Sequence, residues 1–337
     1  MPPLRLLDPA RSQRGDSVLD RLRGDGERPV VDPGLAGGLR DWLEVGLAER
    51  LGPLSDDRPV RVTKERLNQV LVCEAHLAAS QEGPRPVTME LARGSLVDAA
   101  FRHWITVGRS DDPFVDALAA LDVAGDQADV VAFVEGLHAS ERAQLAADVA
   151  HHAHSIASGW PLVSHRWLPR TQERIEVPLV GGRVILTAVV DLLLGAPAGE
   201  RASVCLVEVK SGARRLEHRS DLLYYALLET LRTGAPPFKV ATYYTASGDI
   251  DDEAVTEDLI TGVLVRVLEG TVRLVRLAGG AAPVPSPNPL CAWCVGLPRC
   301  LPGQGRAGTS IPRRGRLEDG EESAHRAPPA VSVRGAG

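Results

Sequence analysis

Residues 184–210 read VILTAVVDLLLGAPAGERASVCLVEVK, and this stretch decides the fold. Two apolar runs rich in β-branched residues, 184–194 and 203–210, are separated by a segment with Gly and Pro, which predicts two neighbouring strands. Three charged residues interrupt these runs: Asp191 in the first, and Glu208 and Lys210 in the second. A charged side chain inside a strand is costly unless it is paired or binds a metal. The three residues therefore point to a site rather than to ordinary sheet packing.

Strand geometry favours the convergence of these three side chains. Glu208 and Lys210 are two residues apart and share one face of their strand, and pairing of the two strands can bring Asp191 beside them. The two carboxylates can hold one or two Mg²⁺ or Mn²⁺ ions, with the carbonyl oxygen of Val209 as a further ligand. Lysine occurs at only three positions in this arginine-rich chain, and Lys210 can orient or deprotonate a water where arginine could not. The pattern favours phosphodiester hydrolysis; a buried structural ion pair is the alternative.

The flanking sequence alternates between strand and helix patterns. A strand is expected over residues 173–180, with a turn at 181–182, and a helix over 216–234 is followed by a strand beginning at 239 and by one or two helices over 253–278. Residues 61–160 show helical periodicity. We therefore predict an α/β fold in which a mixed central sheet is flanked by helices and preceded by an N-terminal helical section. Residues 1–60 are expected to form a peripheral arm, and residues 302–337 a disordered tail.

Four of the five cysteines form a pattern typical of metal or cluster ligation. Cys291, Cys294 and Cys300 place three thiolates in one short loop containing Pro and Gly. Strand alternation points Cys205 away from the charged side chains and into apolar packing. Cys73, at the end of an apolar helical run, is therefore the better fourth ligand. The pattern alone is compatible with a structural zinc loop or with a four-cysteine iron–sulfur cluster.

Composition narrows the class of protein. The 337 residues are 44% hydrophobic and 24% charged, which excludes a fibrous or wholly disordered chain. The net charge of −6 argues against a protein that coats nucleic acid over its whole surface, although a local basic groove remains compatible with it. No apolar run approaches the length of a membrane span, and the N-terminus has no apolar signal region. We therefore predict a cytoplasmic protein without a membrane partner.

The charged residues and the cysteines together resemble a known family. Asp191, Glu208-x-Lys210 and a following helix with Asp221 and Tyr225 look like the PD-(D/E)XK nuclease superfamily in its RecB-like branch. That branch includes the CRISPR-associated exonucleases and helicase-nucleases with one cysteine upstream of the nuclease core and three near its C-terminal end. The split cysteine layout of this chain matches theirs. The resemblance spans about residues 62–301 and implies a restriction-endonuclease-like core over 161–301 and a [4Fe–4S] cluster held by Cys73 and the three loop cysteines.

The resemblance also implies roles for three further residues. The branch carries a glycine followed four residues later by a metal-binding histidine; here Gly94 is followed by Asp98, which can bind Mg²⁺ or Mn²⁺ through oxygen. The branch usually has a glutamine four residues before the tyrosine of its helix motif, and here Asp221 precedes Tyr225. The resemblance implies that Asp221 and Tyr225 position Lys210 or the DNA strand.

These expectations combine into one predicted function: an iron–sulfur-containing, Mg²⁺- or Mn²⁺-dependent deoxyribonuclease, acting as an exonuclease on single strands or DNA ends in repair or defence, with a helicase or another repair or defence protein as a possible partner. Four arginines near the site are candidates for phosphate contacts, unless they only solvate a face: Arg174, Arg214, Arg215 and Arg219. The main alternative is a noncatalytic DNA-binding or adaptor subunit. A third is a zinc-stapled interaction module in which Glu208-x-Lys210 is accidental.

Overall fold

The computed structural model describes residues 18–24, 26–50, 58–82, 86–215 and 217–310. Its helices are α2 (Leu35–Arg50), α3 (Lys64–Val72), α4 (Glu74–Ser80), α5 (Met89–Thr106), α6 (Pro113–Ala124), α7 (Ala128–Glu135), α8 (Ala139–Gly159), α9 (Glu217–Thr233), α10 (Glu257–Ala278) and α11 (Leu301–Ser310). Its strands are β1 (Val60–Val62), β2 (Arg170–Leu179), β3 (Val184–Leu194), β4 (Cys205–Lys210), β5 (Lys239–Tyr244) and β6 (Asp249–Ala254). The predicted mixed α/β fold is confirmed.

The six strands form one mixed sheet in which β3 is the central member. Along one edge, β3 pairs antiparallel with β2 over nearly its whole length. The other edge is shared: β1 pairs with residues 184–186, and β4 pairs with residues 192–194. The sheet continues from β4 through β5, parallel to it, to β6. The α9 crossover between β4 and β5 supplies the connection that parallel neighbours require.

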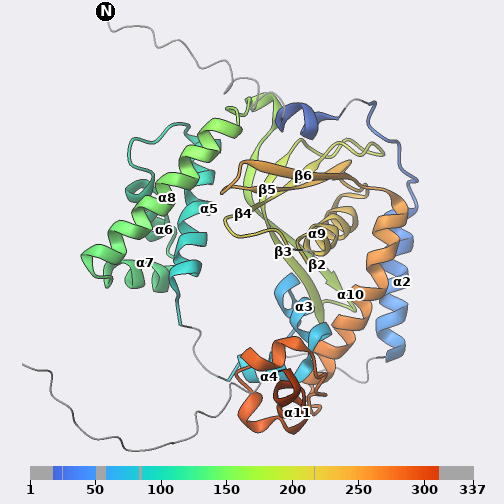
Figure 1. Cartoon of the computed structure of the whole chain (residues 1–337). Coiled ribbons are helices and arrows are strands. Elements are labelled where there is room, and N and C mark those ends of the chain that lie inside the picture. Colours follow the sequence, from blue (N-terminus) through green and yellow to red (C-terminus); the bar gives the residue numbers. More distant parts are fainter. Residues whose placement is uncertain (1–17, 25, 51–57, 83–85, 216, 311–337) are drawn as a thin grey trace, which may run out of the picture.

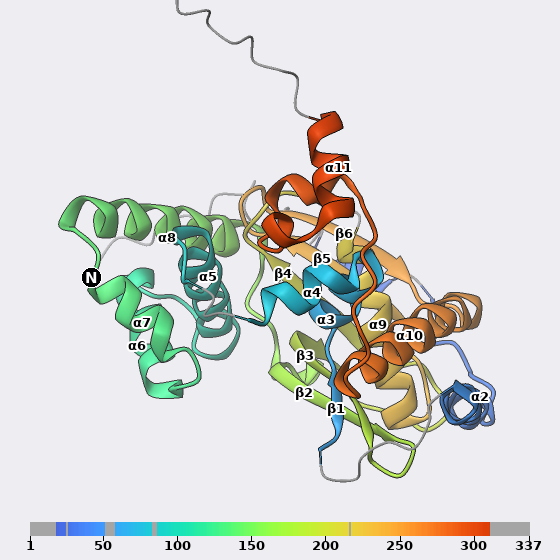
Figure 2. The same cartoon turned by 90° about the horizontal axis from the view of Figure 1, so that it is seen from below.

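Helices cover both faces of this sheet (Figures 1 and 2). Helices α2, α9 and α10 pack on one side, where the largest apolar core joins them to β2 and β3. Helices α5–α8 gather on the other side and have an apolar core of their own. A third core, which includes residues of α5 and α8, joins this helical section to β4 and β5. The helical section is therefore docked against the sheet rather than separate from it.

Several elements differ from the sequence-based expectation. The strand β1 is only three residues long, too short for a periodic pattern, and β6 (DIDDEA) is mostly polar, as an edge strand can be. The pattern over 253–278, expected to form one or two helices, forms one helix, α10, and its first two residues belong to β6 instead. Leucines 39, 43 and 47 of α2 are buried in the main core, so that part of the expected peripheral arm is integral to the fold.

The prediction of a disordered tail from residue 302 is wrong at its start. Residues 301–310 form α11, which packs beside the cysteine loop and buries Ala307. The tail contains no large apolar run, and its first turns are helical because they rest on that loop. Residues 311–337 lie outside the described residues. No helix in the described part of the chain is long and apolar enough to cross a membrane.

Candidate functional site

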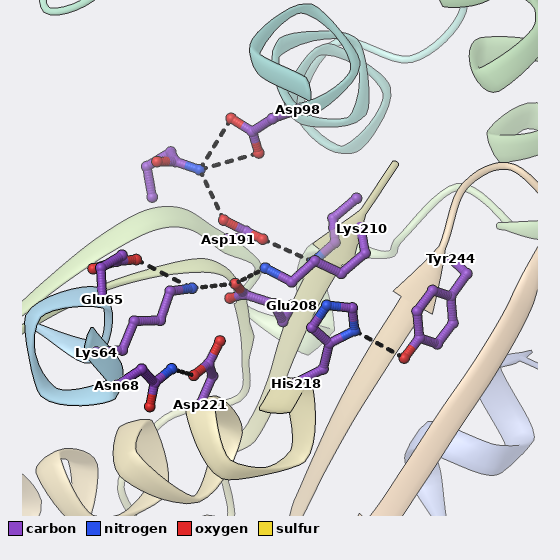
Figure 3. Close-up of polar contacts among 12 residues, drawn as sticks. Lys64, Glu65, Asn68, Asp98, Asp191, Glu208, Lys210, His218, Asp221 and Tyr244 are labelled. Carbon is purple, nitrogen blue, oxygen red and sulfur yellow. Dashed lines mark hydrogen bonds and ion pairs between the residues drawn. The ribbon is translucent and has the colours of Figure 1, made fainter. Parts of the chain in front are cut away.

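The three charged strand residues lie where β3 and β4 diverge (Figure 3). Ladder pairing between the strands stops at Leu192 and Val207. Beyond it, Asp191 Oδ2 accepts the backbone N–H of Val209 at 2.7 Å, in place of a ladder bond. On β4, Lys210 Nζ donates to Glu208 Oε1 at 2.6 Å. The structure therefore brings the predicted carboxylates and lysine together where the pairing of β3 and β4 ends.

A second lysine, missed by the sequence reasoning, reaches the same carboxylate. Lys64 is the first residue of α3, and its Nζ lies 2.5 Å from Glu208 Oε1. Its ammonium also lies 4.8 Å from the ring centroid of Tyr225, a cation–π arrangement. Burial lowers the pKa of Lys64, but the charges of Glu208 and Tyr225 and the hydrogen bonds to them together hold the pKa above its usual value. The scarcity of lysine in this chain was the available signal, since Lys64 is one of only three.

Glu208 has one paired and one unpaired oxygen. Its side chain is 3% exposed, and Oε1 accepts from both lysines. Oε2 is buried and has no hydrogen-bond partner among the described residues. Burial raises the pKa of Glu208, but the ammonium groups of Lys64 and Lys210 together hold it below its usual value. Because an unpartnered buried carboxylate oxygen is costly, Oε2 is an acceptor suited to a bound cation.

Asp98 enters the site from α5 and is linked to Asp191 by a glutamine. Gln172 Nε2 lies 3.2 and 3.3 Å from the two carboxylate oxygens of Asp98 and 3.4 Å from Asp191 Oδ1. Gln172 lies in β2 with φ 52°, a left-handed conformation that is uncommon for a side-chain-bearing residue. Such strain persists only where the surroundings impose it, which is frequent at functional sites. The sequence analysis missed Gln172 because the alternating pattern of a strand does not show which of its polar side chains reaches the residues of a site.

The two bridged carboxylates share a pKa shift in the same direction. Burial, together with the charge of Glu208, raises the pKa of Asp98 to about 6 against the opposing charge of Arg102. Burial, with the charges of Glu208 and Asp98, raises the pKa of Asp191 well above its usual value. Both shifts have the same physical causes, which are the poor solvation of the carboxylates and the repulsion between their charges. A cation would relieve this repulsion.

The site does not hold its carboxylates ready for an ion. Within the described residues, no three histidine, cysteine or acidic side chains are grouped so that they could hold a metal ion. The Gln172 amide lies between Asp98 and Asp191, and the two lysines occupy Glu208 Oε1. The donor set nevertheless suits an oxygen-preferring cation such as Mg²⁺ or Mn²⁺, since it consists of carboxylates and includes the unpaired Glu208 Oε2.

Asp221 and Tyr225 lie on α9 beneath the lysines. Asp221 accepts a hydrogen bond from Asn68 Nδ2 at 2.7 Å, and Tyr225 lies under Lys64 rather than Lys210. Both residues are buried. Their described contacts join α3 to α9, and so they support Lys64.

The four predicted phosphate-binding arginines differ in their partners. Arg214 forms an ion pair with Asp251 at 2.9 Å, and Arg219 with Glu253 at 2.6 Å. Arg215 lies 3.8 Å from Glu217. Arg174 is exposed on β2. Three of the four positive charges are therefore balanced by neighbouring carboxylates.

Cys73, Cys291, Cys294 and Cys300 line one cavity of about 250 Å³, where the Cys73 segment between α3 and α4 meets the C-terminal loop. All are free thiols. Backbone N–H groups of Ser286 and Asn288 approach the sulfurs of Cys73 and Cys291 at 3.4 and 3.3 Å.

A histidine not expected from the sequence also belongs to this cavity. His76 Nδ1 lies 3.3 Å from the sulfur of Cys294. Cys205 is buried in a separate apolar core, where burial raises the pKa of its thiol to about 12. Cys73 thus borders the same cavity as the three loop cysteines, whereas Cys205 does not.

Comparisons with known proteins add distant similarities only. No family model matches the chain. No curated protein matches it. Among solved structures, a "Putative exonuclease" from Eubacterium rectale is 14% identical with a TM-score of 0.40, over 67% of this chain and 84% of that one. A protein named SSO0001 is 13% identical with a TM-score of 0.31, over 79% of this chain and 96% of that one.

Proposed function

We propose that the protein is a divalent-metal-dependent nuclease that hydrolyses phosphodiester bonds in DNA, of the PD-(D/E)XK type. One observation carries the proposal: Asp98, Asp191, Glu208 and Lys210 come from three different elements and converge where β3 and β4 separate, with Glu208 Oε2 buried and unpartnered. A structural ion pair would need one lysine and one carboxylate. In this site burial and mutual repulsion raise the pKa of Asp98 and of Asp191, while the two lysines hold that of Glu208 down. Carboxylates with such perturbed pKa values are typical of metal-assisted hydrolases.

Asp98, Asp191 and Glu208 would hold Mg²⁺ or Mn²⁺, with the carbonyl oxygen of Val209 as a further ligand. The ion would polarise the phosphate and lower the pKa of a bound water. Asp191 is oriented for this role by the N–H of Val209, and Asp98 by Arg102, whose Nε lies 3.2 Å from it. Gln172 keeps the two aspartates together and neutralises part of their repulsion through its amide hydrogens.

The two lysines have different roles at Glu208. Lys210 is the more exposed of the pair, with 23% of its side chain accessible against 15% for Lys64. Lys210 can therefore turn toward a substrate, orient or deprotonate the attacking water, and stabilise negative charge on the phosphate. Lys64 retains its bond to Oε1 meanwhile, so that Glu208 is never left as an unpaired buried charge.

We further propose that Cys73, Cys291, Cys294 and Cys300, which line one cavity, hold a [4Fe–4S] cluster. The cavity is lined by four thiols, and backbone N–H groups approach two of the sulfurs, which suits negatively charged cluster ligands. The cluster would join the α3–α4 segment to the C-terminal loop. A zinc ion on the same thiols is the alternative.

The proposed substrate is single-stranded DNA or DNA ends, cut by an exonuclease in cytoplasmic repair or defence, alone or beside a helicase or other protein. One observation favours the second candidate function, a noncatalytic DNA-binding or adaptor subunit. Both lysines hold Glu208, and no ready-made metal group is present among the described residues. The two candidates differ in whether the purified chain cuts DNA.

The test is cleavage of end-labelled single- and double-stranded DNA by anaerobically purified protein with Mg²⁺ or Mn²⁺. Lys210→Ala and Asp191→Ala are the test variants. Lys239→Ala is the matched control, because Lys239 also pairs with a carboxylate, Asp252, at 2.8 Å, but on β5 and β6 away from the site. Metal-dependent cleavage lost only in the test variants supports the nuclease. A well-folded, cluster-loaded wild type that cuts nothing with either metal contradicts it and favours the adaptor.

A further inference from the structure

A second cavity lies at the opposite end of β4 from Lys210. Its volume is about 220 Å³, and it is lined by Arg23, Arg28, Arg166, Trp167 and Phe238, among others. Leu194, the last residue of β3, also borders it. Leu194 is three residues from Asp191 along β3, a separation of about 10 Å at the usual strand rise. The cavity is thus close enough to the candidate site for one extended ligand to reach both.

Two of the arginines are held in place by aromatic rings. The guanidinium carbon of Arg28 lies 3.5 Å from the ring centroid of Phe238, and that of Arg23 lies 5.7 Å from the centroid of Trp167. Arg28 Nη1 also donates to the carbonyl oxygen of Arg23 at 2.8 Å. Stacking leaves the remaining N–H groups of a planar guanidinium free at its edge. An arginine ordered in this way loses less entropy when it binds an anion.

Among the residues that the structure describes, no carboxylate balances the charge of this cavity. No acidic side chain lines it, and none of its three arginines forms a salt bridge with a described residue. The arginines predicted to contact phosphate differ in this respect, because Arg214 and Arg219 are paired with Asp251 and Glu253. In a chain with a net charge of −6, three guanidinium groups that line one cavity and have no acidic partner in the described part of the chain form a local positive field that attracts an anion.

The segment that carries Arg28 is anchored to the sheet. Ala202 N donates to the Pro29 carbonyl at 2.9 Å, and Val31 N donates to the Glu200 carbonyl at 2.8 Å. These bonds tie residues 29–31 to the connection that leads into β4, whose last residues carry Glu208 and Lys210. The cavity therefore keeps a defined position relative to the candidate site.

We propose that this arginine cavity binds a backbone phosphate of the nucleic-acid strand whose scissile bond lies at Glu208 and Lys210. The inference rests on the proposed nuclease function. Its volume suits one phosphate with part of a nucleotide, and the arginine forks match phosphate geometry. A free phosphate ion or a nucleotide offers the same phosphate group to the arginines. The experiment distinguishes these small ligands from a nucleic-acid strand.

The test measures strand binding without cleavage, by fluorescence anisotropy of a labelled single-stranded oligonucleotide in EDTA over a series of salt concentrations. The variants are Arg28→Gln, Arg166→Gln and the double variant. Arg142→Gln is the matched control, since Arg142 lies over Phe114, 5.3 Å from its centroid, in the helical section. The double variant is expected to bind about tenfold more weakly. Its slope of log K against log salt should become shallower by about 0.7 for each phosphate that it no longer neutralises. The control should change neither quantity.

Binding and salt slope equal to wild type in the double variant would overturn the proposal, whether or not the protein cuts DNA. Loss of binding in a protein that cuts nothing would support a strand-phosphate site in the cavity, but it would overturn the nuclease and with it the placement of a scissile bond at Glu208 and Lys210. Arg166→Gln alone guards against a folding defect, because Arg166 is exposed and its side chain bonds to no described residue. Competition with inorganic phosphate and with a nucleoside monophosphate tests the source. If phosphate or the nucleoside monophosphate binds only when Arg28 is present, while the variants bind the strand as well as the wild type does, the cavity is a small-molecule site. That result would overturn the assignment to a strand phosphate.

Discussion

Lys64 and Lys210 both donate to Oε1 of Glu208. Replacing one lysine at a time therefore tests whether the two have separate roles. Lys64→Met should lower kcat at saturating Mn²⁺ by about tenfold or more, because Glu208 then keeps Lys210 as its only partner. Mn²⁺ affinity should stay the same or increase, since a positive charge beside the carboxylates has been removed. Titration of activity and of bound Mn²⁺ measures both quantities.

Lys239→Met is the control for this prediction, because Lys239 pairs with Asp252 outside the site. Lys64→Arg should restore part of kcat, since it keeps the charge. A loss of Mn²⁺ affinity that parallels the loss of kcat would show that Lys64 only maintains the fold.

The pKa of Asp98, raised to about 6 by burial and by Glu208, makes the stability of the metal-free protein pH-dependent. An ordinary aspartate in the unfolded chain titrates near pH 4. Between these values the folded state binds more protons than the unfolded state, so stability falls as the pH rises. From pH 5 to pH 7 the Asp98 contribution should fall by about 1 kcal/mol.

Urea unfolding in EDTA at pH 5 and pH 7 measures this loss. Asp98→Asn should unfold with a smaller difference between the two pH values than the wild type. Mn²⁺ at pH 7 should stabilise the wild type more than Asp98→Asn, because the variant lacks one ligand charge. An equal pH dependence in both proteins would contradict the assignment.

Among the helices, α3 connects the carboxylate site at Glu208 with the cysteine cavity. Lys64 is its first residue, and Cys73 directly follows its last. Helix α10 holds α3 by close contact: a Cβ added at Gly270 would meet Leu67 Cδ1 at 2.2 Å. Gly270→Ala should therefore destabilise the protein by about 1–3 kcal/mol through overpacking and should lower activity by displacing Lys64.

Gly262→Ala in the same helix is the matched control. Gly262 is exposed, and a Cβ there would meet nothing within 4 Å. Alanine has the higher helix propensity, so this variant should be about 0.5–1 kcal/mol more stable than the wild type. Urea unfolding of both variants checks the pair. Equal effects in both variants would show that α10 is not closely packed against α3 at Gly270.

For the whole molecule, the cavity of four cysteines joins segments more than 200 residues apart in sequence. Cys294→Ser should lose bound iron and visible absorbance and should lower Tm, because the C-terminal loop is released from the α3–α4 segment. Cys205→Ala is the control: Cys205 lies in a separate core, and its loss should leave the iron content unchanged. Metal analysis, absorbance and thermal unfolding measure these effects. Zinc without colour in the wild type would favour the zinc alternative.

Local sequence patterns were sufficient for the long elements. Strands β3 and β4 and helix α9 are dominated by apolar residues with the periodicity of their own backbone, so hydrophobic burial specifies them from the chain itself. The charged interruptions at Asp191, Glu208 and Lys210 could be recognised for the same reason. Strands β1 and β6 could not, because one is too short and the other too polar to show a period, and pairing with β3 and β5 defines them.

The partners of the site came from tertiary packing alone. Lys64, Gln172 and His76 belong to segments remote in sequence from the residues they contact, and each lies in an ordinary local pattern. The same holds for the arginines, whose neighbouring carboxylates on β6 decide which of them are neutralised. Periodicity reports which face of an element is buried, but it carries no information about which other element covers that face. The sequence therefore indicated the chemistry, and the packing of distant segments selected the groups that surround it.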